Sequence, residues 1–341
     1  MNRMKIIALV FSLTFLIILL IPAILVLFVN EPKELVLSEG TQQEGEVKTL
    51  NLEESTVAIK VYRSNQKEIE TVPLEEYIVG VVASEMPVNF ELEALKAQAL
   101  AARTFIVKQL LSNQRDSVPE GADVTDTQNH QVYSSQEELK TKWGKQYQEN
   151  IQKITEAVAA TQGQILTFND QPIYAAFFST SNGKTQNSES YWENELPYLK
   201  SVDSSWDSQS PQFLDRKVFS IDQFEQLLGV EITADSAGEI VGKTEGGYVE
   251  AVNINGKKLT GRKIREQLGL KSSDFSWVVN GDEVVVETKG YGHGVGMSQY
   301  GAHFMAQEGK TYNEIINHYY KGVAINNADP LLTAYIETAK K

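Results

Sequence analysis

Residues 74–87 read Leu-Glu-Glu-Tyr-Ile-Val-Gly-Val-Val-Ala-Ser-Glu-Met-Pro. They predict a helix with one apolar face that ends in a carboxylate. The members of that face are Leu74, Ile78, Val81, Val82 and Glu85. Desolvating an ionised carboxylate is costly unless the group is paired or protonated. The same desolvation raises the pKa of a glutamate toward neutrality, as a general acid requires. Glu85 is therefore the first candidate for catalysis. The alternative is a structural glutamate paired with a cation such as Arg103, and the spacing leaves both open.

Around this helix the pattern predicts several further elements. Before it, residues 57–62 alternate as a strand that pairs with 69–72. After Pro87, Asn89 is the predicted cap of a long alanine-rich helix that runs to about Leu111. The helices and strands predicted later in the chain are a helix over 136–161 stopped by Gly163, strands over 165–168 and 173–178 around a turn at 169–171, a helix capped by Ser220 and ending at Leu228, a strand over 248–254 ending in the Asn255-Gly256 turn, a helix from Thr260 to Leu268, a strand over 284–288 and a helix over 297–308.

The segment 179–212 is rich in Ser, Asn, Gly and Trp and predicts a long ordered loop or a binding surface. The tail from Asn326 carries no signal. Short strands and unevenly spaced helices favour an α+β fold in which mixed elements surround a substrate cleft.

Residues 6–29 carry no charge and predict a membrane anchor. At about 1.5 Å per residue this run exceeds the roughly 30 Å hydrocarbon layer of a bilayer. Arg3 and Lys5 precede it, so the N-terminus is expected in the cytoplasm and the remainder outside the cell membrane. The run ends without a small-residue cleavage site, which favours an uncleaved single-pass protein over a signal peptide. Residues 1–5 form the cytoplasmic tail, and 30–55 form an acidic linker.

Composition excludes several classes of protein. The 341 residues include no cysteine, which excludes disulfides, thiol catalysis and thiolate metal sites. The formal net charge of −14 argues against nucleic acid as a partner.

Four segments together carry a resemblance. They are Ser84-Glu-Met-Pro87, Ala94-Leu-Lys-Ala-Gln-Ala-Leu-Ala-Ala-Arg-Thr104, Ser181-Asn-Gly-Lys-Thr185 followed by Leu196-Pro-Tyr-Leu199, and Gly290-Tyr-Gly-His-Gly-Val-Gly-Met-Ser-Gln-Tyr-Gly-Ala302. The chain closely resembles the stage II sporulation protein D family, which consists of membrane-anchored peptidoglycan lytic transglycosylases of endospore formers. The likeness covers roughly 55–325. It implies an extracytoplasmic catalytic domain over 56–325 and a C-terminal tail over 326–341.

The resemblance implies a reaction that needs one carboxylate. Glu85 would be the general acid and base that cleaves the β-1,4 bond between N-acetylmuramic acid and N-acetylglucosamine and leaves a 1,6-anhydro end. The implied setting is degradation of the septal wall during engulfment. The implied partners are glycan strands stripped of stem peptides, an amidase/endopeptidase and a further membrane protein. The family domain also occurs in a protein that enhances wall amidases, so membership alone does not establish catalysis.

Seven residues are candidates for substrate binding. The resemblance places sugar contacts on Thr185 and Tyr198, whereas a polar turn and a core aromatic are the structural alternatives. Tyr191 is a further candidate. Together with Trp192 and Trp206 it forms a set of aromatic residues typical of carbohydrate grooves and equally of a loop-stabilising core. The remaining candidates are Lys96 and Arg103, seven apart on one helix, together with His293 and Gln299 of the glycine-rich segment.

Arg103 and His293 also have a structural alternative. For Arg103 it is a structural ion pair, and for His293 it is a hydrogen bond to a buried backbone carbonyl. The glycines of 290–301 are expected to permit close backbone approach to the glycan or to helix 297–308, since no lysine motif of a phosphate-binding loop accompanies them.

No cofactor is expected. Some relatives carry a Cys/His zinc site near the loop that here reads Asp126-Thr-Gln-Asn-His-Gln-Val-Tyr133, and this chain offers only His130 there. The four histidines lack the close spacing of zinc ligands; they are His130, His293, His303 and His318. The competing functions are a non-catalytic amidase enhancer that binds cell wall and a zinc-dependent amidase.

Overall fold

The computed structural model describes residues 52, 57–112, 118–192, 194–233 and 237–339. Their fold is mixed α+β, with helices and five small sheets of two or three strands. The predicted cytoplasmic tail at 1–5, the anchor at 6–29 and nearly all of the linker at 30–55 lie outside the described residues. Within the described ranges, no helix combines the length and apolar character needed to span a bilayer.

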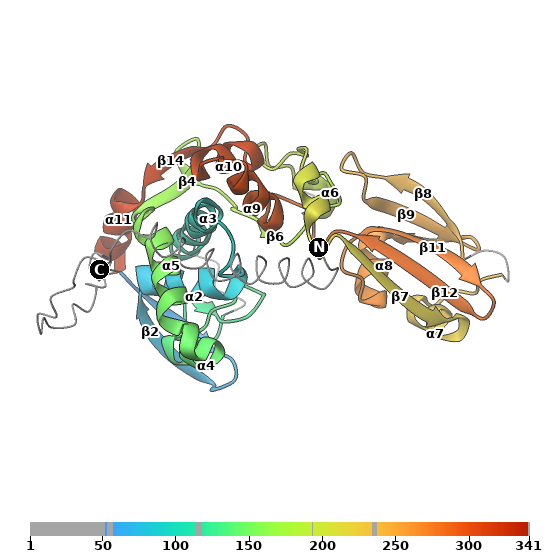
Figure 1. Cartoon of the computed structure of the whole chain (residues 1–341), viewed down its shortest axis with the longest axis horizontal. Coiled ribbons are helices and arrows are strands. Elements are labelled where there is room, and N and C mark those ends of the chain that lie inside the picture. Colours follow the sequence, from blue (N-terminus) through green and yellow to red (C-terminus); the bar gives the residue numbers. More distant parts are fainter. Residues whose placement is uncertain (1–51, 53–56, 113–117, 193, 234–236, 340–341) are drawn as a thin grey trace, which may run out of the picture. The chain divides into compact units, whose positions relative to one another are not determined.

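The larger core is built around α3 (Leu92–Leu111), whose alanines allow neighbours to approach closely. Its five alanines have no exposed surface, and neither do Leu95 and Leu100; they are Ala94, Ala97, Ala99, Ala101 and Ala102. Ala83 of the preceding helix is nearly as buried. The elements that pack on α3 are α2 (Leu74–Glu85), α5 (Tyr147–Ala159), α9 (Gln299–Gln307), α10 (Tyr312–Tyr319) and β4 (Gln164–Phe168) (Figure 1). Segments far apart in sequence thus meet on one helix. The predicted cap Asn89 is wrong by two residues, because Pro87 to Phe90 form a turn and Glu91 precedes the helix.

A small sheet lies before and beside α2. Strands β1 (Ala58–Arg63) and β2 (Glu68–Pro73) pair antiparallel, which confirms the strands predicted at 57–62 and 69–72. The two-residue strand β3 (Val124–Thr125) adds parallel to β1. This pairing starts the loop 126–135 next to the N-terminal sheet.

The single helix predicted over 136–161 is wrong. The chain forms α4 (Gln136–Trp143), a 3-10 turn (Gly144–Gln146) and then α5. Gly144 has φ of 51°, a left-handed conformation that ends α4 and redirects the chain. Ser135 caps α4 in a reciprocal capping box with Glu138.

The strand predicted over 173–178 is wrong for residues 173–176. Only β5 (Gln171–Pro172), paired with β4, and β6 (Phe177–Phe178), parallel to β13 (Met297–Ser298), are strands. Between them the chain leaves one sheet and enters another. The Tyr174 N–H donates to the Tyr198 hydroxyl at 3.0 Å, so a side chain replaces a ladder hydrogen bond there.

A second hydrophobic core occupies residues 214–289. Two three-stranded sheets and two helices enclose it: β7 (Leu214–Ser220), β12 (Glu283–Lys289) and β11 (Asp274–Asn280); β8 (Glu239–Lys243), β9 (Val249–Ile254) and β10 (Lys257–Thr260); α7 (Ile221–Leu228) and α8 (Gly261–Leu268). Ser220 and Thr260 cap the two helices as predicted. The predicted strands at 248–254 and 284–288 are confirmed as β9 and β12, whereas the sequence did not predict β7, β8, β10 and β11.

The body continues beyond Asn326, where the sequence gives no signal. Strand β14 (Ala324–Asn327) pairs antiparallel with β4, and α11 (Asp329–Ala339) follows it. Leu332 of α11 is buried against the larger core. The C-terminal residues to Ala339 are therefore part of the fold.

A buried ion pair joins α2 to α3. Arg103 has no exposed surface, and its Nη2 lies 2.7 Å from Oε2 of Glu75. Its remaining N–H groups reach Thr161 and the backbone carbonyls of Val158 and Gln164. Arg103 thus holds together α2, α3 and the end of α5.

We predict that Arg103→Met destabilises the protein by about 3–5 kcal/mol, because it leaves the Glu75 carboxylate buried and unpaired. Urea denaturation of the purified protein measures this change. The double variant Glu75→Gln/Arg103→Met is expected to recover part of the loss. Lys310→Met, which breaks the exposed pair with Glu314, is the control and should change stability by less than about 1 kcal/mol. The prediction would be contradicted if Arg103→Met and Lys310→Met lowered the free energy of unfolding by equal amounts.

Candidate active site

Glu85 is the last residue of α2, where the chain leaves the helix at Met86 in an extended conformation. Val82 and Met86 are buried, and the Glu85 side chain is half-buried. Its Oε1 accepts a hydrogen bond from the Val132 backbone N–H at 2.8 Å. Among the ion pairs of the described residues none involves Glu85. The alternative partner Arg103 is committed to Glu75.

Burial raises the pKa of Glu85 above its ordinary value of 4.5. The hydrogen bond from Val132 stabilises the ionised form and opposes this shift, but burial has the larger effect. The side chain therefore retains its proton at a higher pH than an exposed glutamate does. A carboxyl group of this kind can donate a proton and then serve as a base.

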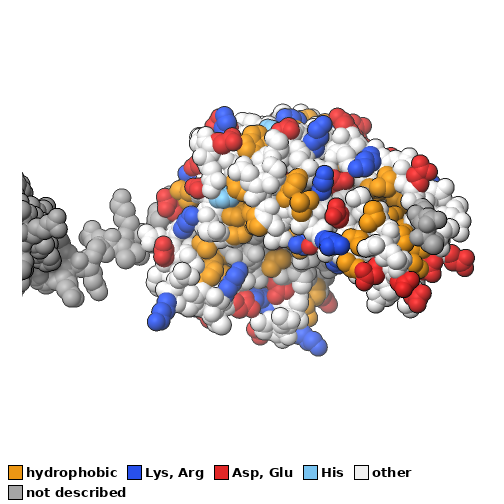
Figure 2. Space-filling model, turned by 45° about the vertical axis from the view of Figure 1, so that its right-hand side comes forward, with side chains coloured by type: hydrophobic (Ala, Val, Ile, Leu, Met, Phe, Trp, Pro, Cys, Tyr) orange, Lys and Arg blue, Asp and Glu red, His pale blue; other side chains and the backbone are white. Residues whose placement is uncertain are grey.

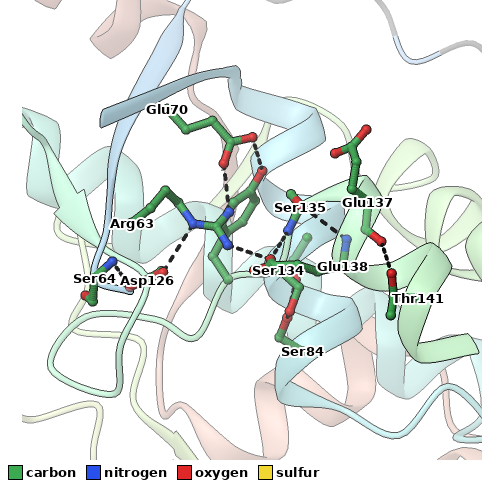
Figure 3. Close-up of polar contacts among 12 residues, drawn as sticks. Arg63, Ser64, Glu70, Ser84, Asp126, Ser134, Ser135, Glu137, Glu138 and Thr141 are labelled. Carbon is green, nitrogen blue, oxygen red and sulfur yellow. Dashed lines mark hydrogen bonds and ion pairs between the residues drawn. The ribbon is translucent and has the colours of Figure 1, made fainter. Parts of the chain in front are cut away.

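The loop 126–135, which supplies the Val132 N–H, is fastened by Arg63 (Figure 3). Arg63 is only 4% exposed and binds three carboxylates from different elements. Its partners are Glu70 of β2 at 2.7 Å, Asp126 of the loop at 3.2 Å and Glu138 of α4. The guanidinium also lies 4.9 Å from the centre of the Tyr133 ring. Both ends of the loop are thus tied to one buried cation.

The same loop packs directly on α2. Tyr133 stacks on Tyr77 with 5.4 Å between ring centres, and the hydroxyls of Ser134 and Ser84 are 2.9 Å apart. Gly80 permits this approach, since a Cβ there would lie 2.4 Å from the Tyr133 ring and 2.6 Å from the Ser134 carbonyl. The contact places Val132 at the C-terminal end of α2, within reach of Glu85.

Three glutamine amides lie near Glu85. Gln299, a candidate from the sequence, is 7% exposed and donates from Nε2 to the Glu85 backbone carbonyl at 2.9 Å. Gln98 approaches Gln299 through its Oε1, and Gln131 precedes Val132 and accepts from the Tyr77 hydroxyl. The Nε2 atoms of Gln98 and Gln131 are buried and have no hydrogen-bond partner. Unused buried donors are costly, so these two amides are functional candidates that the sequence analysis did not select.

Thr185 and Tyr198 lie beneath the surface. Thr185 has no exposed area, donates to the Lys200 carbonyl and accepts from the Val202 N–H at 2.9 Å. Tyr198 is 8% exposed, and its hydroxyl accepts from the Tyr174 N–H. This placement gives both residues a bracing role in segment 179–212 rather than direct contact with a ligand.

The two cationic candidates on α3 are also occupied. Lys96 pairs with Glu93 at 2.5 Å, and its Nζ lies 5.9 Å from the centre of the Tyr312 ring. Arg103 is enclosed with Glu75, as described above. The structural alternative for Arg103, rather than substrate binding, therefore fits its surroundings.

An aromatic cluster surrounds His293. The ring centres of Tyr191, Trp192 and Phe178 lie 5.1–5.6 Å from the His293 ring. Trp206 does not join them, contrary to the grouping suggested by the sequence, because its indole N–H binds Glu308 and its ring packs on His318.

His293 itself is held by backbone groups. Its Nδ1 accepts a hydrogen bond from the Val295 N–H at 3.1 Å. The imidazole ring also forms a hydrogen bond with the Phe177 backbone. Burial, aided by the positive charge of Arg265, lowers the pKa of His293 to about 4. The ring is neutral at ordinary pH and supports the glycine-rich segment.

The glycines of 290–301 admit neighbouring chain segments. A Cβ on Gly296 would lie 2.1 Å from the Ala176 carbonyl, and one on Gly294 would lie 2.6 Å from the Tyr248 ring. Both glycines have positive φ. The close approach predicted from the sequence is thus made to other parts of the protein.

Asp207 is a buried carboxyl group at the centre of a hydrogen-bond network that the sequence did not indicate. It has no exposed surface and accepts hydrogen bonds from three serines: Ser181 at 2.6 Å, Ser204 at 2.7 Å and Ser298 at 2.7 Å. Burial raises its pKa to about 6, although the serine hydroxyls oppose the shift. Asp207 therefore anchors the 179–212 segment to the turn that begins α9.

The remaining histidines lie apart from one another. His130 contacts Thr125, His303 accepts from the Glu91 N–H and stacks on Phe90, and His318 bonds the Asp203 carbonyl. Across the described ranges, no group of three His, Cys, Asp or Glu residues is arranged to hold a metal ion.

Comparisons with known proteins agree with the resemblance seen in the sequence. Residues 62–168 match the family model described as stage II sporulation protein. The chain is 52% identical to the stage II sporulation protein D of Bacillus subtilis (strain 168), over 99% of this chain and 100% of that protein. It is 51% identical to the protein of that name from Bacillus amyloliquefaciens, over 95% and 96% of the two chains. An amidase enhancer of Bacillus subtilis (strain 168) is 29% identical over 73% of this chain and 40% of its own length.

We predict that the wild-type protein loses stability relative to Glu85→Gln as pH rises from about 4 toward neutrality. The raised pKa means that the folded protein keeps a proton that the unfolded chain has released, so unfolding becomes easier as pH increases through this window. Urea denaturation at several pH values measures the difference. Glu76→Gln, on an exposed position of the same helix, is the matched control for loss of a carboxylate. A difference that is constant or of opposite sign would contradict the raised pKa.

Proposed function

The chain belongs to the stage II sporulation protein D family, and on this basis we propose that it is a lytic transglycosylase of peptidoglycan. The substrate is the β-1,4 bond between N-acetylmuramic acid and N-acetylglucosamine. The observation that carries the proposal is the half-buried Glu85 carboxyl, which has a raised pKa and no cationic partner among the described residues.

In the proposed reaction Glu85 acts twice. The protonated carboxyl donates its proton to the glycosidic oxygen, and the bond from that oxygen to the anomeric carbon of N-acetylmuramic acid breaks. The C6 hydroxyl of the same sugar then bonds to the anomeric carbon, and its proton passes to the Glu85 carboxylate. The products are a 1,6-anhydro end and a free 4-hydroxyl, without consumption of water. The Val132 N–H stabilises the carboxylate between the two transfers.

The carboxylates around the loop that carries Val132 are already paired with an arginine, which favours this mechanism over hydrolysis. Ordinary glycosidases use a second carboxylate as a nucleophile or to activate water. Around the loop that carries Val132, the carboxylates of Glu70, Asp126 and Glu138 are all bound by Arg63. An intramolecular hydroxyl needs no such second group.

The proposed setting is the septal wall during engulfment in sporulation. Residues 6–29 would anchor the protein in the cell membrane, with residues 1–5 in the cytoplasm and the body outside. The proposed partners are glycan strands without stem peptides, an amidase/endopeptidase that removes those peptides and a further membrane protein. Nucleic acid is not among them.

A second candidate function is enhancement of an amidase without catalysis. The 29% identical amidase enhancer favours it. Such a protein would bind glycan and stimulate a partner while producing no new glycan ends. The unpaired, half-buried Glu85 distinguishes the catalytic proposal, because a binding module gains nothing from an acid with a raised pKa.

We predict that wild-type protein incubated with stripped glycan strands releases 1,6-anhydro ends, detected by mass spectrometry. Glu85→Gln should lower the rate by about 10²–10⁴-fold, because the amide retains the size of the side chain and loses its proton. Glu76→Gln is the matched control on the same helix and should retain the wild-type rate.

Three outcomes would overturn the proposal. Near wild-type release by Glu85→Gln would remove the assigned acid. Stimulation of an amidase without new ends would identify an enhancer. Loss of activity in excess chelator, with released peptides in place of anhydro sugars, would identify a zinc amidase.

A further inference from the structure

A hollow of about 660 Å³ lies where α8 and β7 meet Tyr191 and the start of the glycine-rich segment. Its walls include four cations and two tyrosines: Tyr191, Arg216, Lys217, Arg265, Lys271 and Tyr291. We infer that this hollow binds carboxylate groups carried by the glycan strand, an inference that rests on the proposed function. It would be a substrate-binding site separate from Glu85.

The local charge contrasts with that of the whole chain. The formal net charge is −14, and acidic side chains gather at the right-hand edge of the face in Figure 2. The hollow instead has four cations in its lining against the carboxylates of Asp215 and Glu266. Such a reversal in an acidic protein selects an anionic ligand locally while the surroundings repel polyanions.

The two carboxylates do not neutralise the site. Asp215 pairs with Lys271 at 3.4 Å, and Glu266 pairs with Arg262 outside the lining at 2.9 Å. Within the described part of the chain, no ion pair joins Arg216, Lys217 or Arg265 to a carboxylate. Among the described residues these three cations are therefore not paired with a carboxylate.

The two guanidinium groups are the best placed for a ligand. Lys217 donates to the Gly269 carbonyl at 2.6 Å, which directs its charge to the end of α8. Arg216 is exposed on β7, and Arg265 makes a long contact of 3.4 Å to the Tyr191 hydroxyl. Guanidinium groups bind carboxylates in a bidentate manner, so this pair suits a carboxylate better than a single ammonium would.

The aromatic walls suit the sugar that bears the carboxylate. Tyr291 is 43% exposed with Lys271 5.4 Å from its ring centre, and Tyr191 has Arg262 at 4.7 Å. Tyr191 also belongs to the aromatic cluster around His293. The exposed ring of Tyr291 and the partly exposed ring of Tyr191 can pack on a pyranose while the cations bind its acidic substituent.

Peptidoglycan offers two sources of carboxylate. A strand without stem peptides has a free lactyl carboxylate on every N-acetylmuramic acid, and an intact strand has carboxylates on its peptides. The wall also contains phosphate polymers, which would compete only if the hollow did not discriminate between anions.

The test measures glycan binding to the full-length Glu85→Gln variant in detergent. The substitution prevents cleavage of the glycan during the measurement. The probes are a stripped glycan oligomer, the same oligomer with its lactyl groups methyl-esterified, an oligomer that keeps its stem peptides, and poly(glycerol phosphate). We expect the stripped oligomer to bind about tenfold more tightly than its ester at low salt, with the difference shrinking as salt is added. Relative binding of the stripped and intact oligomers then distinguishes lactyl from peptide carboxylates.

Adding Arg216→Gln and Arg265→Gln should remove the preference for the free acid and leave binding of the ester unchanged. Lys258→Gln with Lys263→Gln is the matched control, since both lysines are exposed, lie on β10 and α8 around the same smaller core, and are outside the hollow. Circular dichroism melting checks that each variant is folded.

The inference is overturned if acid and ester bind equally, if neither binds, if the control variant loses as much preference, or if poly(glycerol phosphate) displaces the stripped oligomer at equal charge. A different result would refute the proposed function alone. In that case protein with intact Glu85 forms no anhydro ends, although the preference for the free acid persists. Formation of anhydro ends with no effect of the arginine changes would refute the hollow alone.

Discussion

The structure depends on keeping one carboxyl group half-buried without a counter-ion. The Val132 N–H is a dipole, not a full charge, so it stabilises the Glu85 carboxylate without cancelling the effect of burial. A lysine or arginine in the same place would lower the pKa and leave an ordinary ion pair. The two most buried arginines of the larger core are bound elsewhere, Arg63 to three carboxylates and Arg103 to Glu75. Because both arginines are already paired with other carboxylates, they stabilise the fold without forming an ion pair with Glu85.

The sequence revealed the parts of this arrangement that local rules determine. The apolar face ending in Glu85, the alanine-rich helix and the caps Ser220 and Thr260 follow from periodicity and side-chain hydrogen bonding. These features need only neighbours within a few turns. The α+β class follows from the same short-range pattern.

Features that depend on distant partners could not be predicted in this way. The break at Gly144 lies in a charged stretch that reads as continuous helix, and β14 is a strand only because β4 offers an edge. Thr185 and Tyr198 are polar residues in a polar segment, so the sequence does not show that their hydroxyls are used by the backbone. Asp207 is similar, because its three serine partners come from positions up to 91 residues away. Gln98 did leave a signal, as a polar side chain on an alanine-rich helix face.

The glycine-rich segment links the acid to the basic hollow. It begins at Tyr291 in the wall of the hollow, passes His293, and enters α9 at Gln299, which binds the backbone of Glu85. Asp207 holds Ser298 just before that helix, and glycines let the segment lie against Ala176 and Tyr248. A ligand that displaces Tyr291 would therefore act on a chain that is supported at close intervals up to the C-terminal end of α2. Rigid support of this kind fixes the separation between the two sites, so a strand bound in the hollow would present its next sugars in a set register rather than at random.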